Sequence, residues 1–234
     1  MITLALDSAT PRASIAITRD GGSLARTDTD GERTHSETLF RAIAETLDRA
    51  KLSFSDIDLL AVGLGPGAFT ALRVGLTAIK TLSYVRSLPL VGISTLDVLA
   101  YGLFFRNATD SGAIVPMLDA KRGEVYTTRF EIQENGRLTR TGEYRAITHR
   151  DFITTLTESE VLVGSGVDVL GGEIPAGVRV APRVWWDPDA EVLSRLAVEK
   201  FEASGGDDPA RVLPLYIRRS DAEIHWEKKM EGFN

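Results

Sequence analysis

One stretch of this 234-residue chain decides its fold: Gly63-Leu64-Gly65-Pro66-Gly67-Ala68-Phe69-Thr70-Ala71-Leu72-Arg73-Val74-Gly75-Leu76. A glycine-rich turn closes the apolar run at residues 57–62 and opens a segment of helical character. Glycines let a backbone approach a phosphate that a helix N-terminus then stabilises, so the stretch first suggests a nucleotide site.

Two nucleotide-binding fingerprints fail to match this stretch. Gly63, Gly65 and Ala68 have the dinucleotide spacing, but that fingerprint belongs to the first strand–helix turn of a domain and needs an acidic residue about 20 positions later. Here the turn ends the fourth candidate strand, and no acidic residue follows before Asp97. A Walker loop is excluded because no Lys-Ser/Thr pair follows the glycines. We therefore interpret the turn as one that positions a helix, through Gly65, Pro66, Gly67, Thr70 and Arg73.

The composition is that of a globular protein with a sizeable core. Apolar residues make up 43% of the chain and charged residues 26%, and there is no cysteine, which excludes disulfides and thiolate metal sites. No run approaches the roughly 18 uninterrupted apolar residues that cross a bilayer, and the first residues form a strand pattern rather than a signal peptide. We expect a cytoplasmic protein.

The net charge of −6 argues against direct binding of a polyanion, because phosphate contacts supply most non-specific affinity for nucleic acids. A basic cluster near the C-terminus, Arg218-Arg219 and Lys228-Lys229, is typical of a solvated tail. Whether this tail touches RNA is left open. Any link to RNA is expected to run through a partner protein.

The first half of the chain has the element order βββαβαβα. Strands are predicted at residues 1–6, 13–18, 22–27, 57–62 and 90–93. Helices are predicted at residues 34–51, with Thr34 and Glu37 as a capping box, at residues 69–86, and after Ser94.

The second half resembles a shortened copy of the first. Strands at residues 114–118 and 161–163 flank a predicted hairpin of residues 123–130 and 137–144, and a capped helix begins at Thr148. Gly164-Ser165-Gly166 is the counterpart of the first glycine turn, and residues 188–203 form a last helix. Repeats of this kind indicate two related lobes, which we place at residues 1–108 and 109–234.

Two tandem βββαβα lobes, each with an aspartate ending its first strand, predict an α/β fold of the actin-like, sugar-kinase and Hsp70 ATPase superfamily (ASKHA, ribonuclease H-like), with the second lobe reduced. Ligands of that superfamily bind between the lobes. The first loop, residues 7–14, has no glycine for close approach to a phosphate. Independent ATP hydrolysis is therefore not expected, and no cofactor is assigned, although a nucleotide in the cleft or at a complex interface stays open.

Five charged residues are candidates for ligand contacts in this cleft: Asp7, Arg12, Asp119, Arg122 and Glu124. They lie at the ends of the two first strands and in the hairpins that follow. The cluster of Asp119, Arg122 and Glu124 either contacts a nucleotide or partner, or its members pair with one another and with Arg12.

The chain resembles the TsaB family, also called YeaZ, over nearly its whole length. Six pieces carry the resemblance in order: Leu4-Ala5-Leu6-Asp7-Ser8-Ala9-Thr10, Thr34-His35-Ser36-Glu37-Thr38-Leu39, residues 65–75, Ser94-Thr95-Leu96-Asp97-Val98-Leu99-Ala100, Asp119-Ala120-Lys121-Arg122-Gly123-Glu124-Val125-Tyr126 and Pro214-Leu215-Tyr216-Ile217-Arg218. The family usually has Ser at the position of Ala68 and Gly at that of Ala71, so the turn is bulkier here, with an effect that the sequence leaves open.

The resemblance implies a scaffold subunit in threonylcarbamoylation of the adenosine beside the anticodon in tRNAs that read ANN codons. In that machinery the TsaD transferase carries the catalytic metal site, and TsaE, an ATPase, joins TsaD and TsaB. The chain would be a homodimer when alone and would bind TsaD in function. The alternative is a stand-alone ATPase or small-molecule kinase of the actin-like superfamily.

The helix after the glycine turn carries a wide apolar face. Projection of residues 71–84 at 100° per residue places the apolar side chains on an arc of about 200°, roughly twice what one core contact requires. The family resemblance implies that the first two helices form a dimer surface. We expect a partner interface of Leu39, Ile43, Leu47, Ala71, Val74, Gly75, Ala78 and Leu82. The alternative is that the chain's own first helix covers this flank.

Two substitutions follow from this interpretation. We expect Gly75→Arg and Ala78→Arg to leave the fold intact and to abolish association with TsaD, because a long cation cannot enter a close helix contact.

Three other patterns do not indicate catalysis or metal binding. His35-Ser36-Glu37 invites a hydrolase interpretation, but neighbouring helical residues point about 100° apart, so helix capping explains them better. Trp185-Trp186 suggests a platform for bases, yet a tandem pair beside a proline-capped helix is more typical of a core plug. The histidines, His35, His149 and His225, are too far apart to form a metal-binding pair on one helix. No catalytic residue and no metal ligand is predicted.

Overall fold

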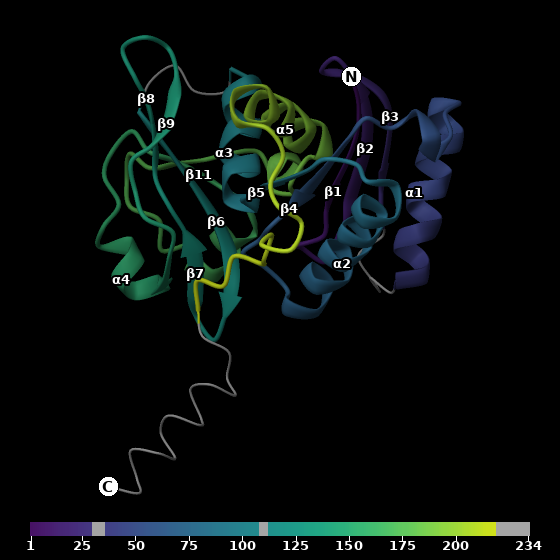
Figure 1. Cartoon of the computed structure of the whole chain (residues 1–234). Helices are drawn as coiled ribbons and strands as arrows, with labels where there is room; N and C mark the ends of the chain where they lie inside the picture. Colours follow the sequence, from purple (N-terminus) through teal and green to yellow (C-terminus); the bar gives the residue numbers. More distant parts are fainter. Residues whose placement is uncertain (30–35, 108–111, 219–234) are drawn as a thin grey trace, which may run out of the picture.

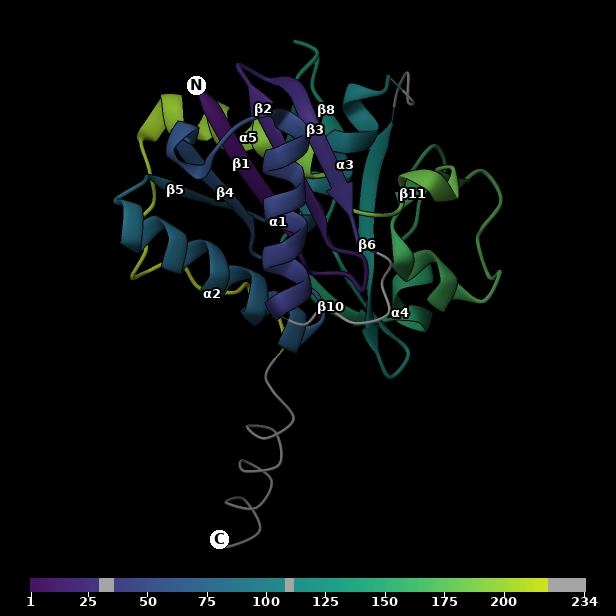
Figure 2. The same cartoon turned by 90° about the vertical axis from the view of Figure 1, so that its right-hand side faces the viewer.

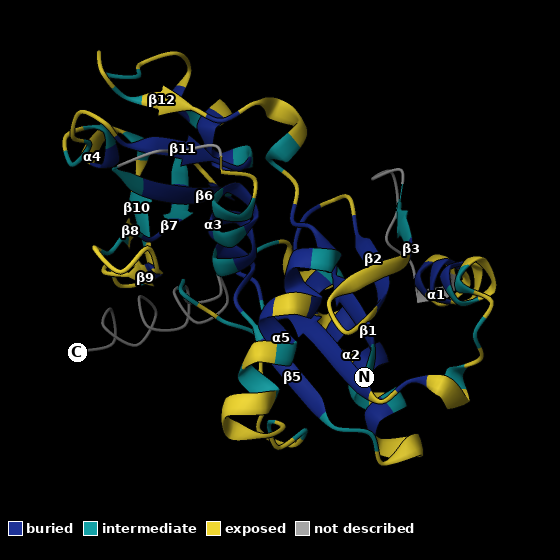
Figure 3. Cartoon of the chain, turned by 90° about the horizontal axis from the view of Figure 1, so that it is seen from above, coloured by how far each residue is buried: buried dark blue, intermediate teal, exposed yellow. Residues whose placement is uncertain are grey.

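The computed structural model describes residues 1–29, 36–107 and 112–218. Two sheets lie side by side, with helices α3 (Thr95–Phe105) and α5 (Ala190–Ser204) between them (Figure 1). The same arrangement is seen from above in Figure 3, where the central strands β1, β4, β6 and β11 are mostly buried. The two-lobed α/β architecture predicted from the sequence is therefore confirmed.

The first sheet has five strands, and its order confirms the predicted elements. From one edge to the other they are β3 (Gly22–Asp28), β2 (Ser14–Arg19), β1 (Ile2–Asp7), β4 (Leu59–Gly63) and β5 (Leu90–Ile93). Strands β1, β4 and β5 run parallel, and β2 is antiparallel to both of its neighbours. The glycine turn thus follows a central strand of the sheet.

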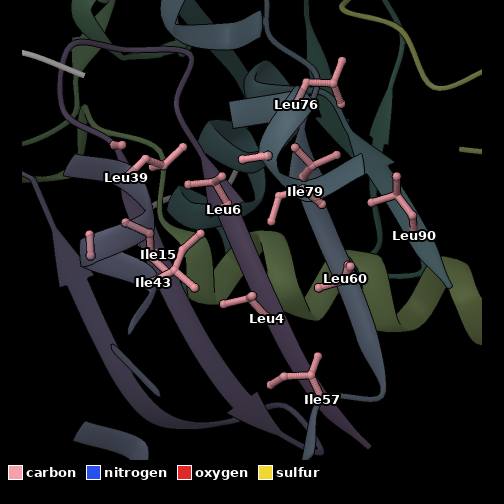
Figure 4. Close-up of a cluster of buried hydrophobic side chains, with 14 of the residues drawn as sticks. Leu4, Leu6, Ile15, Leu39, Ile43, Ile57, Leu60, Leu76, Ile79 and Leu90 are labelled. Atoms are coloured by element: carbon pink, nitrogen blue, oxygen red, sulfur yellow. The ribbon is translucent and has the colours of Figure 1, made fainter. Parts of the chain in front are cut away.

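Helices cover both faces of this sheet. Helices α1 (Ser36–Ala50) and α2 (Phe69–Arg86) pack on one face (Figure 2), and α5 packs on the other, against β1, β2, β4 and β5. Between the sheet and the first pair of helices lies an aliphatic core that includes Leu4, Leu6, Ile15, Ile43 and Ile79 (Figure 4). Removal of this apolar surface from water is the main stabilising contribution to the lobe.

The second sheet is built on one long strand, β6 (Ala113–Lys121). Its path is β10 (Arg145–Thr148), β7 (Glu124–Thr127), β6, β11 (Val161–Val163) and β12 (Arg179–Val180), while β8 (Phe130–Ile132) and β9 (Leu138–Arg140) branch from β6. Strand β6 is antiparallel to β7 and parallel to β11. Because β1 relates to β2 and β4 in the same way, the predicted duplication is visible in the strand pairing.

Two elements of the second half differ from the prediction. The expected hairpin of two long strands is four short strands, because Thr128 and Arg129 leave the ladder: the Thr128 hydroxyl donates to the Gly142 carbonyl at 2.7 Å, and Arg129 pairs with the buried Glu160 at 2.6 Å. Residues 164–166, the predicted counterpart of the first glycine turn, lead into a 3₁₀ segment, η2 (Ser165–Leu170), and not into an α-helix like α2. The predicted turn at residues 134–136 and the Thr148 cap of α4 (His149–Ile153) are confirmed.

The position of α5 was not anticipated from the sequence. This helix follows the second half in the chain but packs on the first sheet. The division of the chain at residue 108 stays a prediction. Two further 3₁₀ segments, η1 (Phe54–Asp56) and η3 (Arg183–Trp185), complete the described elements.

Several predictions fall outside the described residues: the Thr34 cap, His35, His225 and the basic residues Arg219, Lys228 and Lys229. Of Ser36 and Glu37 only the helical backbone is described. Within the described ranges, every helix is too short or too polar to span a lipid bilayer.

Candidate functional site

The end of β1 is connected to the start of α3 by Asp7, which is fully buried. One carboxylate oxygen accepts a hydrogen bond from the Ala9 backbone N–H at 2.9 Å, and the other accepts one from the Thr95 hydroxyl at 2.8 Å. Burial raises the pKa of Asp7 to about 6, while these two hydrogen bonds oppose the increase. The carboxylate therefore holds α3 and the first loop together and does not face the cleft.

The glycines of the turn make room for the first loop rather than for a ligand. A Cβ on Gly63 would lie 2.2 Å from the Asp7 carboxylate, and a Cβ on Gly67 would lie 2.1 Å from the Ala9 carbonyl oxygen. A Cβ on Gly75 would lie 2.1 Å from the Ser8 hydroxyl. The backbone approach that suggested a phosphate cradle is thus made to the chain's own β1 loop.

The turn also makes backbone contacts just before α2 begins. Gly65 has a φ of +85°, which favours glycine, and its carbonyl accepts from the Thr95 N–H at 2.8 Å. The Ala68 N–H donates to the Ala9 carbonyl at 2.8 Å. Pro66 lies with Gly67 on the wall of the cleft. The helix-positioning role of the turn remains a prediction. These contacts connect the turn to the first loop and to α3, as that role requires.

A cleft of about 1160 Å³ separates the two lobes. One wall comes from the first loop and the start of α2, and the other from the β6–β7 hairpin and η2. The residues that supply its charge and aromatic surface are Phe69, Arg73, Asp119, Lys121, Arg122, Tyr126, Asp168, Tyr216 and Arg218. Two of the cationic side chains on this wall are neutralised by ion pairs, Lys121 with Asp119 and Arg218 with Glu124.

Of the five predicted cleft residues, the structure brings only Asp119 and Arg122 to the cleft wall. Asp7 is enclosed in the adjacent packing. Arg12 lies at a second, smaller cavity of about 250 Å³, where its guanidinium is 3.8 Å from Asp187. Glu124 is not on the cleft wall.

The charge pairs are also different from those expected. Asp119 pairs with Lys121 at 2.7 Å, and Glu124 pairs with Arg218 at 3.1 Å. The idea that this cluster pairs with Arg12 is wrong, because Arg12 is held near Asp187 instead.

The sequence interpretation missed the part that the C-terminal segment has in the cleft. The Arg73 guanidinium stacks 3.7 Å from the centre of the Phe69 ring and its Nε donates to the Tyr216 hydroxyl at 2.8 Å. The Phe69 and Tyr216 ring centres are 5.6 Å apart. The motif containing Tyr216 and Arg218 supported the family resemblance, but a motif alone does not indicate what it packs against.

The structure places the predicted interface residues at the seam between α1, α2 and the first sheet. Leu39, Ile43, Gly75 and Ala78 are buried inside the chain, while Leu47, Ala71, Val74 and Leu82 are half-buried. Leu39 and Ile43 of α1 share an apolar cluster with Ala78, as the alternative of an α1-covered flank expects, whereas Gly75 lies against Ser8 and Leu6. An interface role for the set stays a prediction, and the half-buried members are the ones accessible to it.

The expectation that Gly75→Arg and Ala78→Arg leave the fold intact is wrong for Gly75, because even a methyl group there would collide with Ser8. Ala78 is only 5% exposed and belongs to the core, so an arginine would disturb packing there as well. Neither variant tests association separately from folding.

The tandem tryptophans pack as the core-plug interpretation expects. Both are half-buried against the apolar cluster of the second lobe, and the Trp186 indole N–H donates to the Ala181 carbonyl at 2.8 Å. Among the residues that the structure describes, no three His, Cys, Asp or Glu side chains gather as a metal site.

The buried Asp7 predicts a pH-dependent stability. Its pKa of about 6 in the folded chain exceeds the ordinary value of 3.8, so the folded state favours the protonated acid and loses stability as pH rises from about 4 to 6. The difference corresponds to no more than about 3 kcal/mol. We expect the free energy of unfolding of Asp7→Asn, minus that of the parent, to increase when the pH is raised from 4.5 to 7.5. The measurement is urea denaturation at both pH values. An equal gap at both pH values would contradict the assignment.

The strand order and the duplicated lobes define the class by its fold: a duplicated α/β fold of the actin-like type. An activator of 2-hydroxyisocaproyl-CoA dehydratase from Clostridium difficile, solved with bound ADPNP, shares this fold at a TM-score of 0.52 and 13% identity, over 87% of this chain and 97% of that one. YeaZ from Pseudomonas aeruginosa superposes with a TM-score of 0.77 at 23% identity, over 92% of this chain and 99% of that one.

The sequence comparisons give the particular family. A family model described as "TsaD: tRNA N6-adenosine threonylcarbamoyltransferase" matches residues 29–149, just over half of the chain. Proteins named "tRNA threonylcarbamoyladenosine biosynthesis protein TsaB" from Escherichia coli and Bacillus subtilis are each 29% identical, over 97% of this chain and 98% of theirs. The chain therefore belongs to the TsaD-type family, and within it to the TsaB (YeaZ) group.

Proposed function

We propose that this chain is a non-catalytic scaffold in the biosynthesis of threonylcarbamoyladenosine in tRNA, and that it binds and activates a TsaD-like transferase together with a TsaE-like ATPase. The observation that carries the proposal is the similarity over 97% of the chain to the two proteins named TsaB. The net charge of −6 supports contact with tRNA through partners rather than directly. A cytoplasmic location follows from the same proposal.

The first loop supports a role without chemistry of its own. The aspartate that ends β1 is enclosed by Ala9 and Thr95, and the space beside Gly67 is filled by the Ala9 carbonyl. A nucleotide phosphate and its metal ion would need this loop to present a free carboxylate or open backbone N–H groups. The residues present do not fit that requirement.

The outer side of α2 is the surface we propose for the partner. Thr70, Arg73, Thr77, Thr81 and Tyr84 recur at spacings of three and four, and all are exposed. The half-buried Val74 and Leu82 lie beside this row, which places apolar surface within reach of a partner helix. The same face would join two copies when the chain is alone.

The test is a surface substitution that leaves the core untouched. We expect Thr77→Arg to weaken association with the TsaD-like partner at least tenfold, because a long cation at the centre of a helix contact must be desolvated or displace the partner. Binding is measured by isothermal titration calorimetry, and the mass of the mixture by light scattering.

The matched control is Thr154→Arg, the same exchange at an exposed position of the second lobe. It should leave the affinity unchanged. Equal affinities for both variants would show that α2 is not the partner surface, whereas ATP turnover by the purified chain at enzymatic rates would favour the alternative of an ATPase or kinase.

A further inference from the structure

The chain ends its described part by crossing from one lobe to the other. After α5 it returns along the edge of the first sheet, where the Asp207 N–H donates to the Leu90 carbonyl at 2.7 Å and the Asp207 carboxylate accepts from the Gly92 N–H at 2.8 Å. The side chain of Val212 is buried in the core of the first lobe. Residues 213–218, the C-terminal strap, then pass from the side of α2 towards β7 (Figure 1), and residues 215–218 line the cleft.

The strap is first anchored to the glycine turn and α2. The Leu215 N–H donates to the Leu64 carbonyl at 2.8 Å. Tyr216 contacts the start of α2 through the Phe69 ring and accepts a hydrogen bond from Arg73. Both anchors belong to the first lobe.

The next two residues are anchored to the second lobe. Ile217 packs against the apolar cluster that contains Leu118 and Phe130. The Arg218 guanidinium donates to the Ala120 carbonyl at 3.3 Å and forms an ion pair with Glu124 at 3.1 Å. With a side chain only 18% exposed, Arg218 makes a stronger contact than a surface ion pair does.

The outermost of these anchors, Leu215 on the first lobe and Arg218 on the second, are therefore only three residues apart. Three residues of fully extended chain span at most about 11 Å. While both anchors hold, the mouth of the cleft cannot open beyond that reach. Proteins whose lobes close around a ligand need their cleft to open and close.

We propose that the C-terminal strap is a tether that fixes the opening of the inter-lobe cleft and couples it to the first turn of α2. Release of the Arg218 anchor lets the second lobe swing away, and release of Tyr216 frees Phe69 and Arg73 at the same time. The tether acts within a single chain and does not depend on the proposed role in tRNA modification.

The absence of cysteine in the sequence allows a direct distance measurement. Spin labels at Asp48→Cys on α1 and Arg150→Cys on α4 occupy exposed positions on opposite lobes. Pulsed electron spin resonance, with the labelled chain diluted in unlabelled chain, reports the distance between them. We expect one narrow distribution in the parent, and in Arg218→Ala a broader one whose mean is longer by more than about 3 Å, the advance of one extended residue.

Two further variants make the result decisive. Glu124→Gln removes the same ion pair by changing its partner in the second lobe. It should lengthen the mean distance less than Arg218→Ala does, because the Ala120 contact remains. Combined with Arg218→Ala, it should add no further change. Arg211→Ala is the control, since Arg211 is 89% exposed and pairs with Asp208 in its own segment; it should leave the distribution unchanged. Circular dichroism confirms that each variant is folded. An unchanged distribution in folded Arg218→Ala would overturn the tether.

Discussion

Gly67→Ala is expected to destabilise the folded chain by more than about 3 kcal/mol, the upper end of the usual range for overpacking. The added Cβ would lie 2.1 Å from the Ala9 carbonyl oxygen and 2.7 Å from its carbon. These are backbone atoms, and the same carbonyl accepts the Ala68 N–H, so neither side of the contact can yield without loss of the turn. The measurement is the free energy of unfolding in urea.

A second glycine separates backbone from side-chain collisions. Gly75→Ala should also be destabilising, because its Cβ would lie 2.1 Å from the Ser8 hydroxyl oxygen. The double variant with Ser8→Ala removes that oxygen and leaves a closest contact of 3.0 Å to the Ser8 Cβ, so it should recover part of the lost stability. No side-chain substitution can relieve Gly67 in this way.

The control for these variants is Gly102→Ala, within α3. Its Cβ would meet mainly the flexible end of Arg106, and alanine favours the helix by about 1 kcal/mol. Its stability should stay within about 1 kcal/mol of the parent. If Gly67→Ala is equally well tolerated, the close packing of the β1 loop on the turn is not required for the fold.

Strand and helix positions were largely predictable because the physical signals are local. Helix α2 and strands β5 and β11 begin and end at the residues that periodicity and turn signals predict. The broken hairpin after β7 was not predictable, since it depends on Arg129 reaching a buried carboxylate 31 positions along the chain. The packing of α5 on the first sheet was not predictable either, because an amphipathic pattern shows which face of a helix is buried but not which sheet it packs on.

The candidate site was predictable only as a location. Of the two aspartates predicted at the ends of the first strands, Asp119 lies on the cleft wall, but the sequence could not show that Asp7 would face Thr95 rather than the cleft. The sequence shows only that residue 67 is a glycine, and a glycine there could make room either for a phosphate or for a neighbouring carbonyl. Which of the two applies depends on the atom that lies against Gly67. That atom is the Ala9 carbonyl oxygen, from a loop about 60 residues earlier in the chain.

Asp189→Ala is the second substitution with a large expected effect, about 3–5 kcal/mol of lost stability. Asp189 begins α5, where one carboxylate oxygen accepts from the Glu191 N–H at 2.9 Å. The other oxygen accepts from Arg26 of β3 at 2.9 Å and from Arg106, at the end of α3, at 2.8 Å. With its side chain 9% exposed, it joins three elements where the lobes meet. Its loss removes the shared carboxylate of two guanidinium groups, leaving Arg26 with Asp28 and Arg106 with the Gly102 carbonyl, and it leaves the N-terminus of α5 without its cap.

Two matched variants separate these contributions in urea denaturation. Asp189→Asn keeps a capping oxygen and removes the charge, so it should lose less stability than Asp189→Ala, and the difference measures the cap. Asp168→Ala removes an ion pair with Arg183 of the same 2.8 Å length, but both partners are more than half exposed, so the loss should stay below about 1 kcal/mol. If Asp168→Ala and Asp189→Ala cost the same, burial does not set the strength of the Asp189 network, and the junction of α3, α5 and β3 must be held by its apolar contacts alone.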